Sequence, residues 1–146
     1  MNPYRYDIQT LERKARAVRR HIVRLNANSP AGGHTGADLS QVELLTALYF
    51  RVLNVAPDRL DDPQRDIYIQ SKGHAVAATT ASGGSRLLPG RVAGDLPACQ
   101  FPSPRPPGAA KTPGIELNTG ALGHGLPVAV GLALAAKKSN STRRIF

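Results

Sequence analysis

The chain has 146 residues, 41% of them hydrophobic, and a formal net charge of +9. This length predicts one domain or part of a larger one. No stretch has the long uncharged apolar run of a membrane helix, and the first residues lack a signal-peptide pattern. Cys99 is the single cysteine, which excludes a disulfide framework and a cysteine-rich metal site and agrees with a reducing, cytoplasmic compartment.

The excess of positive charge has two interpretations. Clustered Lys and Arg side chains bind nucleic-acid phosphates. Here the basic residues are spread along the chain, without interleaved aromatic residues and without a helix-turn-helix or zinc-finger spacing. An anionic small molecule would explain the charge equally well, so a basic module that binds nucleic acid stays the lesser alternative.

The first predicted element is an amphipathic helix from Asp7 to Leu25. Its apolar residues recur at spacings of three and four, which places them in one stripe. They are Ile8, Leu11, Ala15, Val18, Ile22 and Leu25. The other faces carry Arg13, Lys14, Arg16, Arg19, Arg20 and Arg24. We expect a solvated basic face, and an acidic partner surface stays open as an alternative.

A loop rich in Gly and Pro follows at 26–38, and His34 lies in it between Gly33 and Thr35. A histidine flanked by glycines can point into a cleft. Its imidazole can donate or accept a hydrogen bond, or transfer a proton, near neutral pH. In isolation, such a histidine is more often an ordinary surface residue.

A second helix is predicted from Gln41 to about Leu53. Ser40 and Glu43 have the spacing of a capping box, and Leu39 and Leu44 have the spacing of a hydrophobic staple. The expected core-facing residues are Leu45, Leu48, Phe50 and Val52.

The run from Asp66 to Gln70 is short and β-branched, which predicts a strand. A polar turn, Ser71 to His74, separates it from the start of a further helix at Ala75. In open α/β folds, ligands bind at the carboxyl edge of the sheet, where this order places His74. The alternative for His74 is a structural helix cap.

The last predicted element, from Asn118 to Lys138, is a glycine loop that leads into an apolar run long enough for a buried helix. Gly120, Gly123 and Gly125 permit tight turns and close approach of a ligand. The helix N-terminus offers unpaired N–H groups to an anionic or polar cofactor. Pro127 suits the first turn, and Asn140 is the expected stop. An ordinary loop and a buried helix are the alternative.

Three segments, taken together and in this order, resemble the N-terminal half of transketolases. They are Gly33 to Gly36, Asp66 to Ala75 and Pro113 to Gly125. The resemblance covers residues 1–78 and 111–146 and is greatest to the split type, in which separate N-terminal and C-terminal subunits pair. It implies an α/β fold of the thiamine-diphosphate-binding type, with a parallel sheet flanked by helices, incomplete in this chain.

The resemblance also implies an activity and roles for particular residues. The activity is transfer of a two-carbon ketol unit between sugar phosphates, as in the pentose phosphate pathway. His34 and His74 would act on the substrate, and His74 would also lie at thiamine diphosphate. The loop residues implied to touch this cofactor are Gly120, Ala121 and Leu122. Many transketolases have Gln where this chain has His124, so His124 is a weaker candidate.

The resemblance further implies a metal and partners. Family members hold Mg²⁺, or Ca²⁺ in its place, through a Gly-Asp-Gly motif and a downstream Asn, which would follow Phe146. A hard cation needs oxygen ligands, and no residue of this chain matches those positions. The family places its cofactor between subunits, so we expect homodimerisation and a C-terminal transketolase subunit. The isolated 146-residue chain is expected to be inactive.

Residues 79–110 depart from this resemblance and make the chain a partial domain with an irregular segment. The segment is rich in Gly, Pro, Ser and Arg and lacks periodicity. If each codon is started one base later, permitted codons give an amphipathic helix end over 79–89 and a Gly-His-Pro motif within 100–109, as in the family. We hypothesise a frame-shifted segment. A genuine Pro/Gly-rich insertion is the alternative.

Two other functions stay open. One is another thiamine-diphosphate enzyme, either a deoxyxylulose-phosphate synthase or a component of a 2-oxoacid dehydrogenase. The runs Ser71 to His74 and Thr119 to Gly123 favour a transketolase over these. The other is a basic binding module without enzymatic activity, for which salt-sensitive binding to nucleic acid would be the sign.

Overall fold

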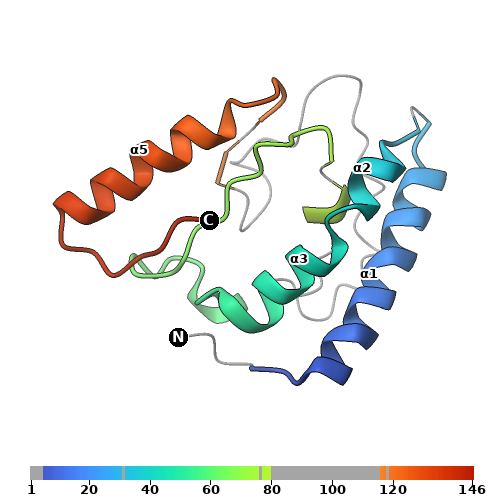
Figure 1. Ribbon diagram of the computed structural model, residues 1–146, viewed down its shortest axis with the longest axis horizontal. Coiled ribbons are helices and arrows are strands. Elements are labelled where there is room, and N and C mark those ends of the chain that lie inside the picture. The colour runs from blue at the N-terminus through green and yellow to red at the C-terminus, as the bar shows by residue number, and fades with distance from the viewer. Residues whose placement is uncertain (1–4, 31, 76, 80–115, 118) are drawn as a thin grey trace.

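A computed structural model describes residues 5–30, 32–75, 77–79, 116–117 and 119–146. Figure 1 shows α1 and α5 on opposite sides of the view, with the extended chain around residues 66–72 between them. The predictions for Cys99 and for nearly all of 79–110 lie outside the described residues. Thr79, the first residue of that segment, is helical and buried.

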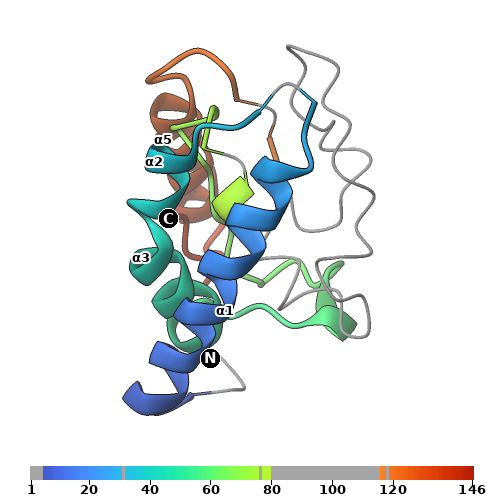
Figure 2. The ribbon, with the colours of Figure 1, turned by 90° about the vertical axis from the view of Figure 1, so that its right-hand side faces the viewer.

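Helix α1 spans Ile8–Ala27, close to the first predicted helix. The carboxylate of Asp7 caps it by accepting a hydrogen bond from the backbone N–H of Thr10 at 2.8 Å. The middle of the predicted apolar stripe is buried, and α1 packs along α2 and α3 (Figure 2). Ile8, at the start of the stripe, is exposed.

The second predicted helix, from Gln41 to about Leu53, is preceded by a short helix that the predicted loop at 26–38 did not include. Helix α2 spans Thr35–Leu39, and helix α3 spans Val42–Ala47. The chain then continues as a π-helical turn, η1, over Leu48–Val52, in which the N–H of Leu53 donates to the carbonyl of Leu48 at 2.8 Å. The helix predicted from Gln41 to about Leu53 is confirmed as α3 and η1, whereas the predicted loop is wrong in its last residues, which form α2.

The predicted capping box and staple are wrong. The Ser40 hydroxyl donates to the carbonyl of Ala37 in the preceding helix at 2.8 Å, and Glu43 pairs instead with Arg19 of α1. Leu44 is 59% exposed, so it forms no staple. Val52 is also exposed, because the π-helical turn rotates the chain away from the spacing of an α-helix.

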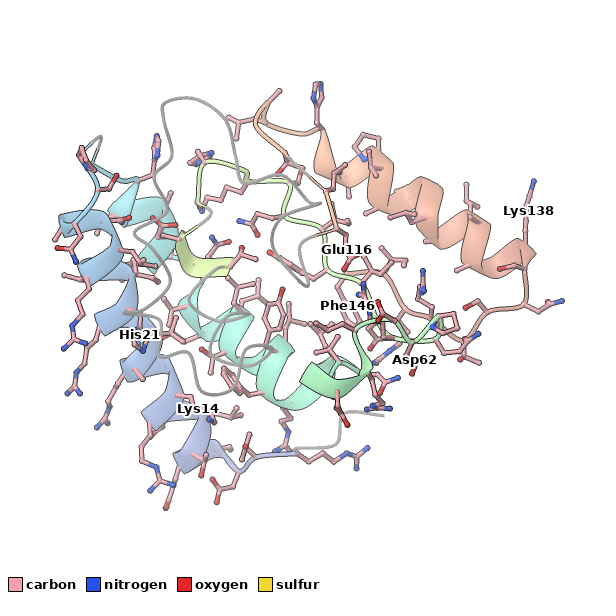
Figure 3. The ribbon with its side chains drawn as sticks, turned by 180° about the vertical axis from the view of Figure 1, so that it is seen from behind. Lys14, His21, Asp62, Glu116, Lys138 and Phe146 are labelled. Atoms are coloured by element: carbon pink, nitrogen blue, oxygen red, sulfur yellow. The ribbon has the colours of Figure 1, made fainter. Side chains whose placement is uncertain are left out.

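The core lies between α1 and the α3–η1 region. Its buried members are Ala15, Val18, Ile22, Val42, Leu45, Leu48, Tyr49, Phe50, Leu53, Val55 and Ala78. Phe146 packs against this cluster from the last residue of the chain (Figure 3). A 3₁₀ turn, η2, over Pro57–Arg59 leads from the core to the extended segment.

The predicted strand pairs with the last residues of the chain in parallel orientation. Ile67 donates from its N–H to the carbonyl of Arg144 at 3.0 Å, and Phe146 donates to the carbonyl of Ile67 at 2.9 Å. Ile69 continues the pattern by donating to Phe146 at 2.9 Å. The described residues hold only this isolated bridge, between Ile67 and Ile145, instead of the expected parallel sheet. A parallel sheet needs further strands joined by crossover connections, and the described ranges contain just two paired extended segments.

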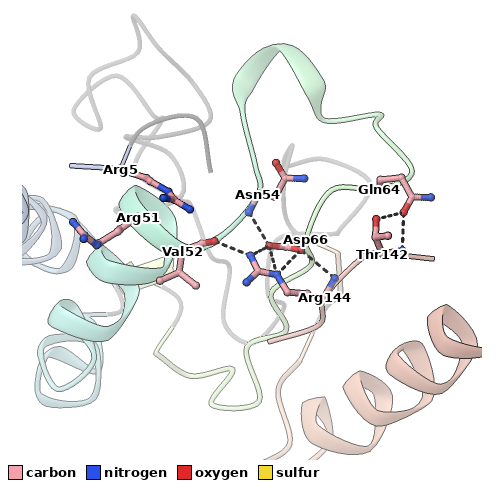
Figure 4. A pocket seen from close by; sticks show the side chains of 8 residues that line it. All are labelled: Arg5, Arg51, Val52, Asn54, Gln64, Asp66, Thr142 and Arg144. Atoms are coloured by element: carbon pink, nitrogen blue, oxygen red, sulfur yellow. Dashed lines mark hydrogen bonds and ion pairs between the residues drawn. The ribbon is translucent and has the colours of Figure 1, made fainter. Parts of the chain in front are cut away.

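A network of hydrogen bonds and an ion pair joins the two paired segments (Figure 4). The carboxylate of Asp66 accepts hydrogen bonds from the backbone N–H groups of Asn54, at 2.7 Å, and Arg144, at 3.0 Å, and from the Arg144 guanidinium. Gln64 accepts a further bond from the N–H of Thr142 at 2.9 Å. A pocket of about 340 Å³ lies beside this network and is lined by none of the predicted site residues.

Helix α5 spans Gly125–Lys138, as the glycine loop and the apolar run predict. Asn140 ends it with φ 51°, and the N–H groups of Asn140 and Ser141 donate to the carbonyls of Lys137 and Ala136 at 3.3 Å and 2.9 Å. This pattern is a Schellman motif. Lys138 lies in the last turn (Figure 3), where a cation is favoured.

The expected burial of α5 is wrong. Leu126, Val130 and Leu134 are all more than half exposed, and within the helix only Gly125 and Ala136 are buried. An apolar helix is buried only where other elements cover it, and here the described elements cover one edge of α5. Along the described stretches, no helix is both long enough and apolar enough to cross a membrane.

Candidate functional site

His34 lies at the N-cap of α2, on the loop that follows α1. The loop packs closely against Asn26: a Cβ atom added to Gly33 would overlap the Asn26 side-chain oxygen. The carbonyl of His34 accepts the first-turn hydrogen bond of α2, from the N–H of Asp38 at 2.9 Å. The His34 side chain is exposed, as a histidine on a glycine-flanked loop can be.

His74 lies in the turn that follows the paired segment at Ile67. The N–H of Ala75 donates to the carbonyl of Lys72 at 2.9 Å, which closes the turn, and residues 77–79 are helical. The His74 side chain is half-buried. The predicted order of extended segment, polar turn and helix is therefore present around His74.

The two histidines meet although forty positions separate them in the chain. Their rings lie edge to face, with centroids 5.2 Å apart and an interplanar angle of 65°. Two imidazoles at this separation can both contact one small polar ligand, because each ring has two nitrogens that donate or accept hydrogen bonds. The structure thus joins the first and second sequence motifs into one site.

The glycine loop is fastened to the same turn at both ends. At one end, Thr119 donates through its hydroxyl to the carbonyl of Gln70, and a Cβ atom on Gly73 would overlap the Thr119 carbonyl oxygen. At the other end, the N–H of Leu126 donates to the Ser71 hydroxyl at 3.2 Å. The third motif therefore packs directly on the second.

Close packing at the far end of the loop also requires glycine. A Cβ atom on Gly125 would meet the Cα atom of Ser71 at 2.6 Å. Gly123 has φ 87°, a conformation that other residues rarely adopt. Ser71 acts here as a helix cap from a distant segment, because Leu126 is a first-turn residue of α5 whose N–H has no intrahelical partner.

The remaining predicted residues lie on this loop. Gly120, Ala121 and Leu122 are exposed, and Leu122 has 72% of its surface accessible. His124 is exposed at the N-cap of α5. The structure brings the ends of the loop to the His74 turn and leaves the loop residues open to a ligand.

Two polar side chains between α2 and α3, Ser40 and Gln41, hold the His74 turn, and the sequence patterns did not assign Gln41 to the site. Gln41 donates to the carbonyl of Ala75 at 2.9 Å and accepts from the Gln70 amide at 3.0 Å. Lys72 donates to the Ser40 hydroxyl at 2.8 Å. The signal that could have found Gln41 is a polar residue between apolar helical positions, since buried polar groups need partners.

Tyr68 extends the network under the turn. Its hydroxyl donates to the side-chain oxygen of Gln70, and Gln70 also donates to the carbonyl of Lys72 at 3.1 Å. Burial raises the pKa of the Tyr68 hydroxyl to about 12, so this group stays a protonated donor near neutral pH.

The described residues do not contain a cluster of metal-binding side chains. Within the described ranges, no three His, Cys, Asp or Glu side chains gather closely enough to hold a metal ion. The described residues therefore offer no ligand set that fits the expected Mg²⁺.

Similarity to known proteins identifies the family of this chain. Residues 12–144 match the family model described as the transketolase, thiamine diphosphate binding domain. The chain belongs to the transketolase family. An α/β thiamine-diphosphate-binding fold follows from this membership, although the described residues are mostly helical.

Several curated transketolase relatives are similar over most of the chain. The chain is 61% identical to an apulose-4-phosphate transketolase subunit from Actinobacillus succinogenes, with 100% of the chain and 53% of the relative aligned. It is 38% identical to the protein of the same name from Phocaeicola vulgatus, over 96% of the chain and 50% of the relative. A 6-deoxy-6-sulfo-D-fructose transketolase subunit of a Clostridium species is 36% identical, over 78% of the chain and 42% of the relative. The chain spans about half the length of these relatives.

The candidate site contains groups of the kind that bind a polar, anionic cofactor. Gly73 and Gly125 leave no room for a side chain between the two loops, and the helix N-terminus of α5 lies beside them. Both histidines face the same region through their ring contact. Thiamine diphosphate carries a diphosphate group of the kind that glycine loops and helix N-termini bind.

Proposed function

We propose that the chain is the N-terminal section of a transketolase, which transfers a two-carbon ketol unit between sugar phosphates with thiamine diphosphate. The observation that carries the proposal is the contact between His34 and His74, 5.2 Å apart, beside the glycine loop in a chain of this family. The curated relatives named as transketolase subunits favour this function over the two other thiamine enzymes considered.

The proposed roles follow from the chemistry of the side chains. Gly120, Ala121 and Leu122, with His74, would hold thiamine diphosphate. That cofactor supplies the carbanion chemistry, and the protein supplies orientation and electrostatics. His34 and His74 would donate hydrogen bonds to sugar hydroxyls and hold or move a proton at the reacting oxygen.

The proposal includes partners outside this chain. A divalent cation such as Mg²⁺ would need ligands from residues other than those described. The relatives are themselves named as transketolase subunits, which supports a second polypeptide that supplies the C-terminal half, and homodimerisation is proposed with it. Alone, the 146-residue chain would show no ketol transfer, and transfer measured on the purified chain would refute this part.

The positive test of the site is a chimera in which this chain is followed by the uncovered half of the Actinobacillus succinogenes relative. Calorimetric titration of this chimera, combined with the C-terminal partner subunit of the same relative, with thiamine diphosphate and Mg²⁺ should show binding. His74→Ala should weaken that binding, because it removes a side chain proposed to touch the cofactor. His21→Ala, which changes a histidine on α1, is the matched control and should bind as the unmodified chimera does.

A second chimera, which also takes residues 79–110 from the relative, separates a damaged segment from a wrong site assignment. If the second chimera binds and the first does not, the segment is at fault. If neither binds, or if His74→Ala binds normally, the site assignment is refuted.

A further inference from the structure

Asp38 is a buried carboxylate that forms hydrogen bonds with two segments of the candidate site, the one next to the His34 loop and the one after His74. Its side chain belongs to α2, and only 1% of the residue is exposed. One oxygen accepts a hydrogen bond from the N–H of Ala78 at 3.2 Å, and the other accepts from the side-chain amide of Asn26 at 3.1 Å. A buried carboxylate needs such donors, and here both come from other segments.

The bond to Ala78 fastens the helical turn that follows His74. Residues 77–79 are helical, so the N–H of Ala78 lies in a first turn and has no partner within that helix. A carboxylate at this position satisfies the donor and favours the positive end of the helix dipole. Asp38 thus acts as a cap supplied from a residue forty positions earlier.

The bond to Asn26 fastens the loop that carries His34. The Asn26 amide also donates to the Thr35 hydroxyl at 3.1 Å, and its oxygen occupies the space beside Gly33. The backbone N–H of Asp38 itself donates to the carbonyl of His34. Asp38 is therefore linked to the residues on either side of His34 and to the helix after His74.

We propose that Asp38 is a positioning residue that sets the separation and mutual angle of His34 and His74. Its role in the reaction rests on the proposed function, whereas its effect on the two rings does not. Asp38 touches neither ring in this arrangement and acts through Asn26, Thr35 and Ala78.

The hydrogen bonds of the Asp38 side chain predict a specific effect of replacing it by Asn. Both partners of Asp38 are donors, and a carboxylate accepts on both oxygens. Asn has the same shape with one acceptor and one donor, so Asp38→Asn loses the bond to Ala78 or the bond to Asn26 unless the Asn26 amide turns around to accept. That turn would require the Thr35 hydroxyl to reverse and donate, and it would place the amide NH2 group beside Gly33, so the loop that carries His34 changes in either case.

The test is NMR spectroscopy of the ring protons in the full 146-residue chain. Histidines 34 and 74 should show a nuclear Overhauser contact and mutual ring-current shifts. In Asp38→Asn this cross-peak should be lost and both sets of ring signals should move. Signals of His21, which lies on α1, should stay. Asp58→Asn makes the same charge change at an exposed position and should alter none of them.

A second substitution keeps the proposal falsifiable if Asp38→Asn does not fold. Asn26→Ala removes the donor on the His34 side and leaves the bond between Asp38 and Ala78. It should move the His34 signals and weaken the cross-peak while the His74 signals stay close to those of the unmodified chain. An unchanged cross-peak in either folded variant, or no cross-peak in the unmodified chain, overturns the proposal.

The proposed function is tested by different measurements, so the two failures are distinguishable. Failure of the chimera to bind thiamine diphosphate would leave the ring contacts unaffected. If the ring signals of His34 and His74 do not change in Asp38→Asn, the positioning role fails, but the proposal that the chimera binds thiamine diphosphate is unaffected. In the chimera, Asp38→Asn should weaken thiamine diphosphate binding in the same direction as His74→Ala.

Discussion

The guanidinium of Arg144 pairs with the carboxylate of Asp66, 78 positions earlier in the chain, and its Nε atom lies 3.1 Å from one Asp66 oxygen. The pair joins the two extended segments where they form their parallel bridge. Asp66 is only 2% exposed, so hydrogen bonds from protein donors must replace the bonds to water that this carboxylate loses on burial.

Asp66→Asn should lower the free energy of unfolding by about 1–3 kcal/mol, the cost of leaving a buried hydrogen-bonding group without its partner. The full cost of breaking a buried ion pair does not apply, because the Arg144 side chain is half exposed. The amide would place a donor against the Arg144 guanidinium or the N–H of Asn54. Urea denaturation followed by circular dichroism measures the change. Asp61→Asn, at an exposed position, should change little, and an equal loss in both variants would contradict the prediction.

The same carboxyl should make stability depend on pH. Burial by itself raises the pKa of Asp66, but hydrogen bonds from Arg144 and from the backbone of Asn54 outweigh it and hold the pKa below its ordinary value of 3.8. A carboxyl with a lower pKa in the folded state contributes stability above its unfolded pKa and loses it as the pH falls through the folded pKa. Stability measured from pH 5 downward should therefore fall below about pH 4, and less steeply in Asp66→Asn.

Gly73→Ala should disturb the candidate site directly. The added Cβ atom would overlap the backbone carbonyl oxygen of Thr119, so the glycine loop would have to move away from the His74 turn. We expect lower stability and, in the chimera, weaker thiamine diphosphate binding. Gly131→Ala in α5 is the matched control: nothing lies within 4 Å of its added Cβ atom, and it should raise stability by about 0.5–1 kcal/mol. Unchanged binding in Gly73→Ala would show that the loop contact is dispensable.

The C-terminal end of α5 gives a prediction about local structure. Asn140 has φ 51° in the Schellman motif, a conformation that Gly adopts without cost and a β-branched residue adopts poorly. Asn140→Gly should keep or slightly raise the melting temperature. Asn140→Val should lower the free energy of unfolding by about 1–2 kcal/mol. Equal melting temperatures for the two variants would argue against this cap.

The coding DNA tests the hypothesis about residues 79–110. We expect one-base changes that shift the frame near Ala78 and restore it near Ala110. The shifted frame should encode a helix end after residue 79 and a Gly-His-Pro motif. Sequencing the gene through codon 146 is sufficient, and an open frame without the two compensating changes would favour a genuine insertion.

The sequence alone determined the local elements whose signals are local. Apolar spacing predicted α1, and the capping and stop residues of α5 were visible as Pro127 and Asn140. The capping-box pattern failed at Ser40, because this residue ends α2 and its hydroxyl donates to the Ala37 carbonyl, while the N-cap of α3 is Gln41. Burial of α5 also failed, since an apolar helix carries no information about what covers it.

The sequence, through its three motifs in order, also determined the family and named His34 and His74 as members of one site. Only the tertiary structure decided how they meet, at 5.2 Å and edge to face. It also decided that Gly73 packs on Thr119 and that Asp38 links both loops. The physical reason is that spacing and propensity act over a few residues, whereas these contacts join positions forty or more apart and arise only when the core brings the segments together.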